Sequence, residues 1–149
     1  MTEEYFNKEA LTYLNKHFTY TPDYKWWDAG KFMTLNKTPV GTPLKGDCED
    51  YSFHVARYVL GDGSLKTFYK GLWDVDFEFW WVKTNSGGNH CILIDNLDDS
   101  AIDNWTKSFV SVEEMGALHK LKYKLPAVAV LWMLFAGALD SGVKKLFWK

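Results

Sequence analysis

The chain has 149 residues, which is enough for a single packed core and predicts one domain over residues 1–149. Hydrophobic residues make up 47% of the sequence and charged residues 24%, a globular composition that excludes an intrinsically disordered chain. The 19 acidic and 17 basic residues give a net charge of -2, which argues against nucleic acid as a partner because phosphate binding needs a concentrated basic face.

The first half of the chain predicts two helices separated by a long irregular segment. Residues 3–18 carry apolar side chains at nearly helical spacing and are expected to form an amphipathic helix. Residues 19–45 hold three of the four prolines and are expected to be irregular. Asp47 is typical of an N-cap, and it predicts a helix over residues 48–60 that ends at Gly61.

The second half predicts an antiparallel sheet, because the apolar period changes from helical to two. Strands are expected at residues 77–84, 89–95 and 101–105, joined by turns rich in glycine, asparagine and aspartate. A helix is expected over residues 111–122. The predicted fold class is therefore α+β, with a helix packed on an antiparallel sheet.

The C-terminal segment 126–149 begins with an uninterrupted apolar stretch and ends in lysines and aromatic residues. A transmembrane helix needs about 20 apolar residues, and this stretch is shorter. We expect a buried strand or helix here. The alternative is a segment that binds a membrane surface or a protein partner.

Cys48 is the candidate nucleophile, because the predicted helix begins at this residue. A helix N-terminus lowers the pKa of a thiol by presenting unpaired N–H groups and the positive end of the helix dipole. Glu49 and Asp50 oppose that effect, so activation also requires an imidazolium partner. The alternative is that Cys48 is a small buried apolar residue, as cysteines usually are.

His90 is the candidate base, because it follows a glycine-rich turn at the start of a predicted strand. Of the other histidines, His17 ends a predicted helix and His119 lies in a charged segment. His54 lies on the same predicted helix as Cys48 but points away from it, at about 100° per residue. The alternative for His90 is a structural hydrogen bond within the sheet.

Asp103 is the candidate that orients His90. Side chains of a strand alternate between the two faces of a sheet. If Ile94 pairs with Asp99, His90 lies directly opposite Asp103, and a register slip of two residues leaves Asp103 as a diagonal neighbour on the same face. The alternation directs Cys91 to the opposite face, which excludes it as the nucleophile.

A cysteine, a histidine and an aspartate can carry out a complete acyl-transfer cycle. The imidazole takes the thiol proton, the thiolate attacks a carbonyl, and the imidazolium protonates the leaving amine. The backbone N–H of Cys48 is expected to supply half of an oxyanion hole.

The segment Gly46-Asp47-Cys48-Glu49-Asp50-Tyr51 resembles the G-D-C-E-D-[YF]-A signature of the bacterial transglutaminase-like cysteine proteinases, although Ser52 replaces the final small apolar residue. Farther along, Ala101-Ile102-Asp103-Asn104-Trp105 is similar to the apolar-Asp-Asn-apolar motif of that family. The resemblance covers about residues 40–106.

The resemblance implies a papain/transglutaminase-like fold, with Cys48, His90 and Asp103 as the catalytic triad. It also implies that Asp47 and Glu49 are the positions matching a calcium site. One carboxylate pair is far short of the 6 to 8 oxygens that calcium takes, so no cofactor is expected to be required and calcium is retained as an alternative.

The leading functional prediction is a cysteine peptidase or amidase acting on a peptide or protein, including peptidoglycan peptides. The alternatives are a transglutaminase-like acyl transferase and a non-catalytic structural or binding protein of a phage particle. Phage-encoded members of such families are similarly short. Because no secretory signal is visible, we expect a cytoplasmic or virion-associated protein.

Overall fold

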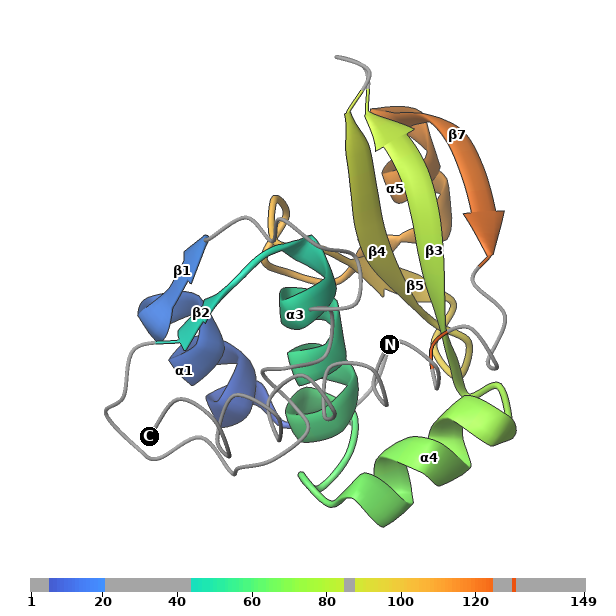
Figure 1. The fold of residues 1–149 in the computed structure, drawn as a ribbon. Helices are drawn as coiled ribbons and strands as arrows, with labels where there is room; N and C mark the ends of the chain where they lie inside the picture. Colours follow the sequence, from blue (N-terminus) through green and yellow to red (C-terminus); the bar gives the residue numbers. More distant parts are fainter. Residues whose placement is uncertain (1–5, 21–43, 85–87, 125–129, 131–149) are drawn as a thin grey trace, which may run out of the picture.

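The computed structural model describes residues 6–20, 44–84, 88–124 and 130 (Figure 1). Within these ranges the chain is α+β, as expected. The elements, in chain order, are α1 (Lys8–His17), β1 (Phe18–Tyr20), β2 (Leu44–Gly46), α3 (Cys48–His54), a π-helix (Val55–Val59), α4 (Leu65–Trp73), β3 (Phe77–Thr84), β4 (Asn89–Asp95), β5 (Ser100–Ile102), β6 (Val110–Ser111), α5 (Val112–Leu118) and β7 (His119–Lys124).

The main sheet has five strands in the order β6-β5-β4-β3-β7, and every neighbouring pair is antiparallel. Helix α3 packs on one face, where Cys91 and Leu93 of β4 join the larger hydrophobic cluster with α1 and α3. Ile92 and Ile94 face the other way and pack with Met115 of α5. The predicted alternation of side chains along β4 is therefore confirmed, and it separates the sheet into an α3 face and an α5 face.

The helix that carries Cys48 begins as predicted. Asp47 is its N-cap and accepts hydrogen bonds from the backbone N–H groups of Glu49 and Asp50, while the Asp50 carboxylate accepts from the Asp47 N–H. This reciprocal capping box fixes the first turn. The predicted single helix over residues 48–60 is wrong in its second half, because the backbone becomes a π-helix from Val55.

Gly61 follows that π-helix and is required by a close approach of the backbone. A Cβ added at Gly61 would lie 2.8 Å from the carbonyl oxygen of Arg57. The glycine therefore allows the chain to turn back toward α4. Helix α4 itself was not among the predicted elements; it begins at the N-cap Ser64, whose side chain accepts from the Thr67 N–H.

Strand β5 pairs with β4 in the second of the two predicted registers. Ile94 lies opposite Ala101 and Leu93 opposite Ile102, so Asp103 is a diagonal neighbour of His90. The strand is also shorter than residues 101–105. It ends at Ile102 because Asp103 Oδ1 accepts the N–H groups of Trp105 and Thr106 and bends the chain into a turn.

The predicted helix over residues 111–122 is correct only in its first part. Ser111 caps α5 as expected, but the helix ends at Leu118. His119 has an extended backbone, with φ -133 and ψ 142, and it begins strand β7 at the edge of the sheet beside β3.

The predicted irregular segment falls mostly outside the described residues, which resume at the short parallel strand β2 beside β1. The C-terminal segment 126–149 also lies outside them apart from Val130, which is buried in the main core. Among the helices of the described chain, none is long and apolar enough to cross a membrane. Cys48 and Cys91 are both free thiols.

Candidate functional site

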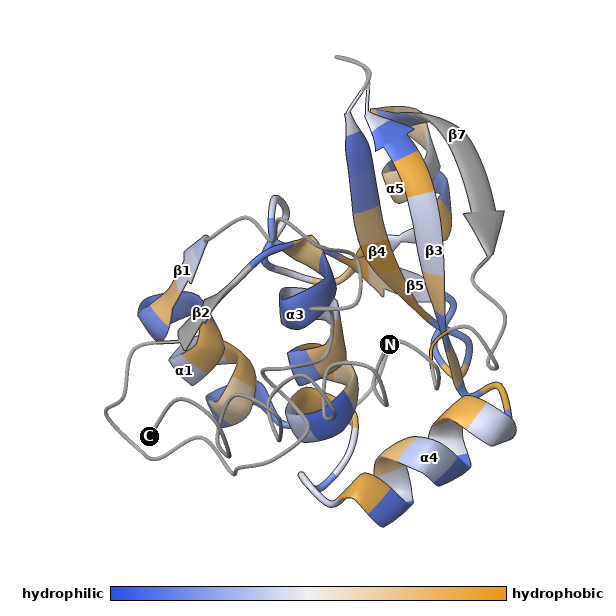
Figure 2. Cartoon of the chain, viewed as in Figure 1, coloured by the Kyte–Doolittle hydropathy of each residue, from blue (hydrophilic) through white to orange (hydrophobic). Residues whose placement is uncertain are grey.

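His90 and Asp103 form a buried hydrogen-bonded pair. His90 is the second residue of β4 and follows the exposed Asn89; the strand is hydrophilic at its start and hydrophobic along most of its length (Figure 2). Its Nε2 lies 2.8 Å from Asp103 Oδ2, and both residues are at most 3% exposed. The diagonal register therefore brings together the histidine and the carboxylate that the sequence predicted as partners.

The protonation of this pair follows from the environment of the carboxylate. Burial would raise the pKa of Asp103, but the hydrogen bonds from His90 and from the Thr106 N–H outweigh it and hold the pKa below its ordinary value. An ionised carboxylate can only accept hydrogen bonds, so His90 Nε2 carries the proton. The lone pair of a neutral His90 is then on Nδ1.

Cys48 lies at the uncovered edge of β4, next to His90. Because β5 ends at Ile102, the backbone N–H of Cys91 has no partner strand on that side, and it donates to Cys48 Sγ at 3.3 Å. That nitrogen is one peptide bond from the His90 Cα, so the sulfur lies within about 6 Å of this Cα. The tip of α3 thus fills the position that a longer β5 would occupy.

The thiol of Cys48 is not directed at His90. Its Sγ donates to Glu49 Oε2 at 3.6 Å, and no described residue forms a hydrogen bond with His90 Nδ1. Burial raises the pKa of Cys48, and the charges of Glu49 and Asp47 raise it further. The lowering of the pKa by the helix N-terminus is therefore outweighed here, because Cys48 is only 7% exposed and two carboxyl groups lie beside its thiol.

The backbone N–H of Cys48 differs from its neighbours at the start of α3. The carboxylates of Asp47 and Asp50 bind the other N–H groups at the start of α3, and within the described chain nothing accepts from the Cys48 N–H. This is the donor that the sequence assigned to an oxyanion hole.

Asp47, Cys48 and Glu49 bring two carboxyl groups and a thiol within 4.8 Å of one another. Burial raises the pKa of Glu49 well above its ordinary value, and the adjacent Asp47 raises it further, so this pair holds a proton at neutral pH. Asp47 Oδ1 is already used in capping α3. Calcium takes 6 to 8 oxygens, so the pair would need most of its ligands from elsewhere.

His119 is a residue of the site that the sequence did not single out. Its Nε2 lies 3.6 Å from Asp103 Oδ2, and its side chain is fully buried. In the sequence, lysines alternate with His119, Leu121 and Tyr123, and this period of two is the pattern that predicts strand β7. The pairing of β3 with β7 shifts in register between Lys83 and Thr84, and Thr84 is the residue that pairs with His119.

Trp105 covers the pair from the solvent side. Its ring stacks on His90 with centroids 4.6 Å apart and an interplanar angle of 27°, and it lies 5.7 Å from the ring of His119. Trp105 is nevertheless 56% exposed. It therefore shields the imidazole and at the same time presents an aromatic face to an incoming molecule.

Asn15 of α1 ties the Cys48 helix to the Asp103 turn. Its Oδ1 accepts from the hydroxyl of Tyr51 on α3 at 2.6 Å, and its Nδ2 donates to the carbonyl of Lys107 at 2.8 Å. The Lys107 N–H in turn donates to the carbonyl of Asp103. Burial and the charge of Asp103 raise the pKa of Tyr51, so its hydroxyl remains a donor.

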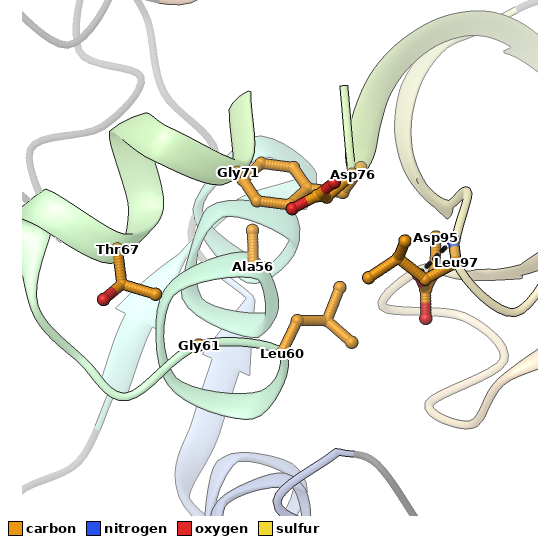
Figure 3. Close-up of a pocket in the computed structure, with 9 residues that line it drawn as sticks. Ala56, Leu60, Gly61, Thr67, Gly71, Asp76, Asp95 and Leu97 are labelled. Atoms are coloured by element: carbon orange, nitrogen blue, oxygen red, sulfur yellow. Dashed lines mark hydrogen bonds between the residues drawn. The ribbon is translucent and has the colours of Figure 1, made fainter. Parts of the chain in front are cut away.

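A cavity of about 160 Å³ lies elsewhere, between the π-helix, α4 and the first residues of β3 (Figure 3). Its walls include Ala56, Gly71, Phe77 and Asp95, and none of the candidate catalytic residues. It is therefore separate from the site at the tip of α3.

Comparisons with known proteins do not decide the family. No protein-family model, curated protein or solved structure matches this chain. The geometry of Cys48, His90 and Asp103 is therefore the basis on which a function can be inferred.

Proposed function

We propose that the chain is a thiol hydrolase, a cysteine peptidase or amidase that cleaves peptide or amide bonds through an acyl-enzyme on Cys48. One observation carries the proposal: Cys48 Sγ contacts the backbone N–H of Cys91, one residue beyond His90, whose ring is held by Asp103. A nucleophile, a base and an orienting carboxylate within reach of one another support this chemistry.

In the proposed cycle, Cys48 rotates away from Glu49 and gives its proton to His90 Nδ1. The thiolate attacks the carbonyl carbon, and the oxyanion that forms accepts a hydrogen bond from the Cys48 N–H. His90 then protonates the leaving amine, and a thioester remains on Cys48. Water, activated by His90, attacks the thioester and releases the acid, while Asp103 holds the ring and its tautomer throughout.

The required rotation is supported by the short distance between the sulfur and the start of β4. Hydrogen bonds of catalytic groups are often long or misaligned in unliganded enzymes and tighten when substrate binds. We also propose that the fold is papain/transglutaminase-like. The contact between the N-terminus of α3 and the start of β4 supports this.

The proposed substrate is an amide of a peptide or protein, with peptidoglycan peptides as one class. If an amine replaces water in the second half of the cycle, the same residues perform transglutaminase-like acyl transfer. We propose a cytoplasmic or virion-associated location for the protein, and calcium binding at Asp47 and Glu49 remains a prediction that a calcium titration followed by thermal unfolding would test.

A second candidate function is a non-catalytic structural or binding module, such as a component of a phage particle. The raised pKa of the buried Cys48 favours it, because a thiol is a weak nucleophile when it is not ionised.

Alkylation with iodoacetamide separates the two candidates. In chelator-treated protein, a hydrolase is expected to label at Cys48 much faster than at Cys91, which is fully buried. The preference should disappear in His90→Ala and persist in His17→Ala, a matched loss of a histidine outside the site. Equal and slow labelling of both cysteines would refute the hydrolase. Release of amine from peptide substrates, with and without an added amine acceptor, then distinguishes hydrolysis from transfer.

A further inference from the structure

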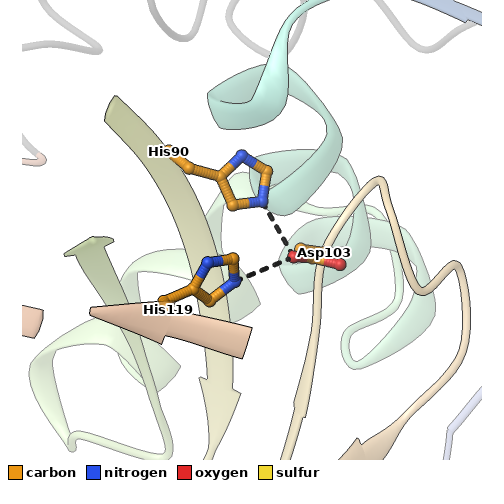
Figure 4. Close-up of side chains that lie close together, drawn as sticks. All are labelled: His90, Asp103 and His119. Atoms are coloured by element: carbon orange, nitrogen blue, oxygen red, sulfur yellow. Dashed lines mark hydrogen bonds and ion pairs between the residues drawn. The ribbon is translucent and has the colours of Figure 1, made fainter. Parts of the chain in front are cut away.

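Three buried side chains converge on one point beside the proposed triad (Figure 4). His90 comes from the start of β4, Asp103 from the turn after β5, and His119 from the start of β7. Both histidines direct Nε2 toward the same carboxylate oxygen, Asp103 Oδ2, at 2.8 and 3.6 Å. The proposed hydrolase uses only His90 and Asp103, so the chemistry of the triad does not explain His119.

The donor set is that of a transition-metal site. The three ligand atoms all lie within 4.8 Å of one another. Zinc binds imidazole nitrogen and carboxylate oxygen at about 2.0–2.1 Å, which places tetrahedral ligands about 3.3 Å apart. His90 Nε2 and His119 Nε2 lie 2.8 and 3.6 Å from Asp103 Oδ2, so both separations are within about half an ångström of this value.

The surroundings of the carboxylate would also stabilise a bound ion. Asp103 Oδ1 accepts from the backbone N–H groups of Trp105 and Thr106, which fixes the orientation of the carboxylate and leaves Oδ2 directed at the histidines. Such outer contacts are typical of metal ligands. The exposed Trp105 is the cover that must move to admit an ion, because its ring lies against both His90 and His119.

We propose that His90 Nε2, Asp103 Oδ2 and His119 Nε2 bind one divalent transition-metal ion of the zinc class. Two imidazoles and one carboxylate favour zinc, cobalt or nickel over calcium and magnesium, which take oxygen ligands. The site is distinct from Asp47 and Glu49, whose neighbour Cys48 would add a sulfur ligand.

Metal binding has a direct consequence for Cys48, and this part of the inference rests on the proposed function. An ion on His90 Nε2 displaces the proton from that nitrogen, and a neutral ring then holds its remaining proton on Nδ1. Nδ1 is the atom that accepts the Cys48 proton in the proposed cycle. The metal-bound protein is therefore inhibited, and the metal-free protein is the active form.

Cobalt titration of the chelator-treated full-length chain tests the site without relying on activity. The Cys48→Ala variant, which removes the competing thiol, is expected to bind one equivalent of Co²⁺ and to develop visible ligand-field absorption. Zn²⁺ should displace the cobalt, and Ca²⁺ in excess should not. Absence of saturable binding, or cobalt absorption that requires the Cys48 sulfur, would overturn the proposal.

Two further variants locate the ion. In the same Cys48→Ala background, His119→Gln should weaken cobalt binding by more than about 100-fold, since loss of outer partners alone costs about 10–100-fold. His17→Ala, the matched histidine control, should bind as the parent does. Asp103→Asn keeps the shape of the side chain and removes its charge, so it should also lose binding, and circular dichroism verifies that each variant is folded. Unchanged affinity in folded His119→Gln would exclude this ligand set.

The inhibitory consequence has its own readout. In protein with Cys48 intact, Zn²⁺ should slow alkylation of Cys48, and His119→Gln should need far more zinc for the same effect. Equal zinc sensitivity of the two proteins would refute the coupling between the metal site and the thiol. Slow alkylation of Cys48 in metal-free wild type would instead count against the proposed hydrolase, so the two failures are distinguishable.

Discussion

His54 makes the stability of this protein depend on pH in a direction that can be stated in advance. It is the last residue of α3, it is 4% exposed, and its ring lies 4.6 Å from that of Tyr58. Burial lowers the pKa of His54 from 6.5 to about 4, and the positive charge of Arg57 contributes to the shift. Between these two values the unfolded chain binds more protons than the folded one, so stability is lost as the pH falls through this window.

The size of the effect follows from the two pKa values. For an unfolded pKa of 6.5 and a folded pKa of about 4, acidification from pH 7 to pH 5 removes about 2 kcal/mol of stability, and further acidification to pH 4 removes about 3 kcal/mol in total. These free energies describe His54 alone, so the experiment must separate the effect of His54 from that of the carboxyl groups, which also titrate on acidification.

The perturbation is His54→Phe, which keeps an aromatic ring beside Tyr58 and removes the titration. Urea unfolding of both proteins at pH 7 and pH 5 gives four free energies, and the difference of differences isolates His54. We expect the wild type to lose about 2 kcal/mol more than the variant on acidification. If both proteins lose the same unfolding free energy, His54 is not buried in its neutral form, which would contradict the packing of α3 described above.

Three further predictions concern the start of α3 and the turn after the π-helix. Glu49→Gln, measured in the presence of chelator, should stabilise the protein at pH 8 but not at pH 4. Burial raises the pKa of Glu49 in the folded state, so the wild type loses stability as the pH rises and the variant does not. Asp47→Ala should lower the unfolding free energy by about 0.5–2 kcal/mol in urea titration through loss of the capping box, and an unchanged midpoint would contradict that role. Gly61→Ala should lower the unfolding free energy by about 1–3 kcal/mol, because its Cβ would lie 2.8 Å from a backbone oxygen. In the control Gly88→Ala the nearest atom to the added Cβ is 3.6 Å away, so the same urea titration should show almost no change.

The local parts of the structure could be predicted from sequence because they depend on neighbouring residues. The Asp47 cap follows from an acidic residue before a helical pattern, and the faces of β4 follow from the period of two. The pairing of Asp103 with His90 could be narrowed to two registers but not to one, since the choice depends on how the intervening turn folds. Both registers kept the two side chains on one face, so the prediction was insensitive to that choice.

The features that were not predicted from the sequence depend on tertiary contacts, which no local sequence pattern reports. The pKa of Cys48 rises because α3 is buried against β4, and no local pattern reports that burial. Strand β5 stops early because the Asp103 carboxylate takes two backbone N–H groups that a strand would have used otherwise. His119 was overlooked because the lysines around it suggest a solvated segment, although their alternation is that of an edge strand.

Asn15 has a consequence for any attempt to trim the protein. The nucleophile, imidazole and carboxylate candidates all lie downstream of α1, so a shortened version starting after residue 17 would retain every one of them. Such a fragment would nevertheless lose the amide that links Tyr51 to the Lys107 carbonyl, and with it a brace between the thiol helix and the aspartate turn. Retaining the three candidate residues would then not guarantee their alignment, and α1 belongs to the smallest fragment expected to keep it.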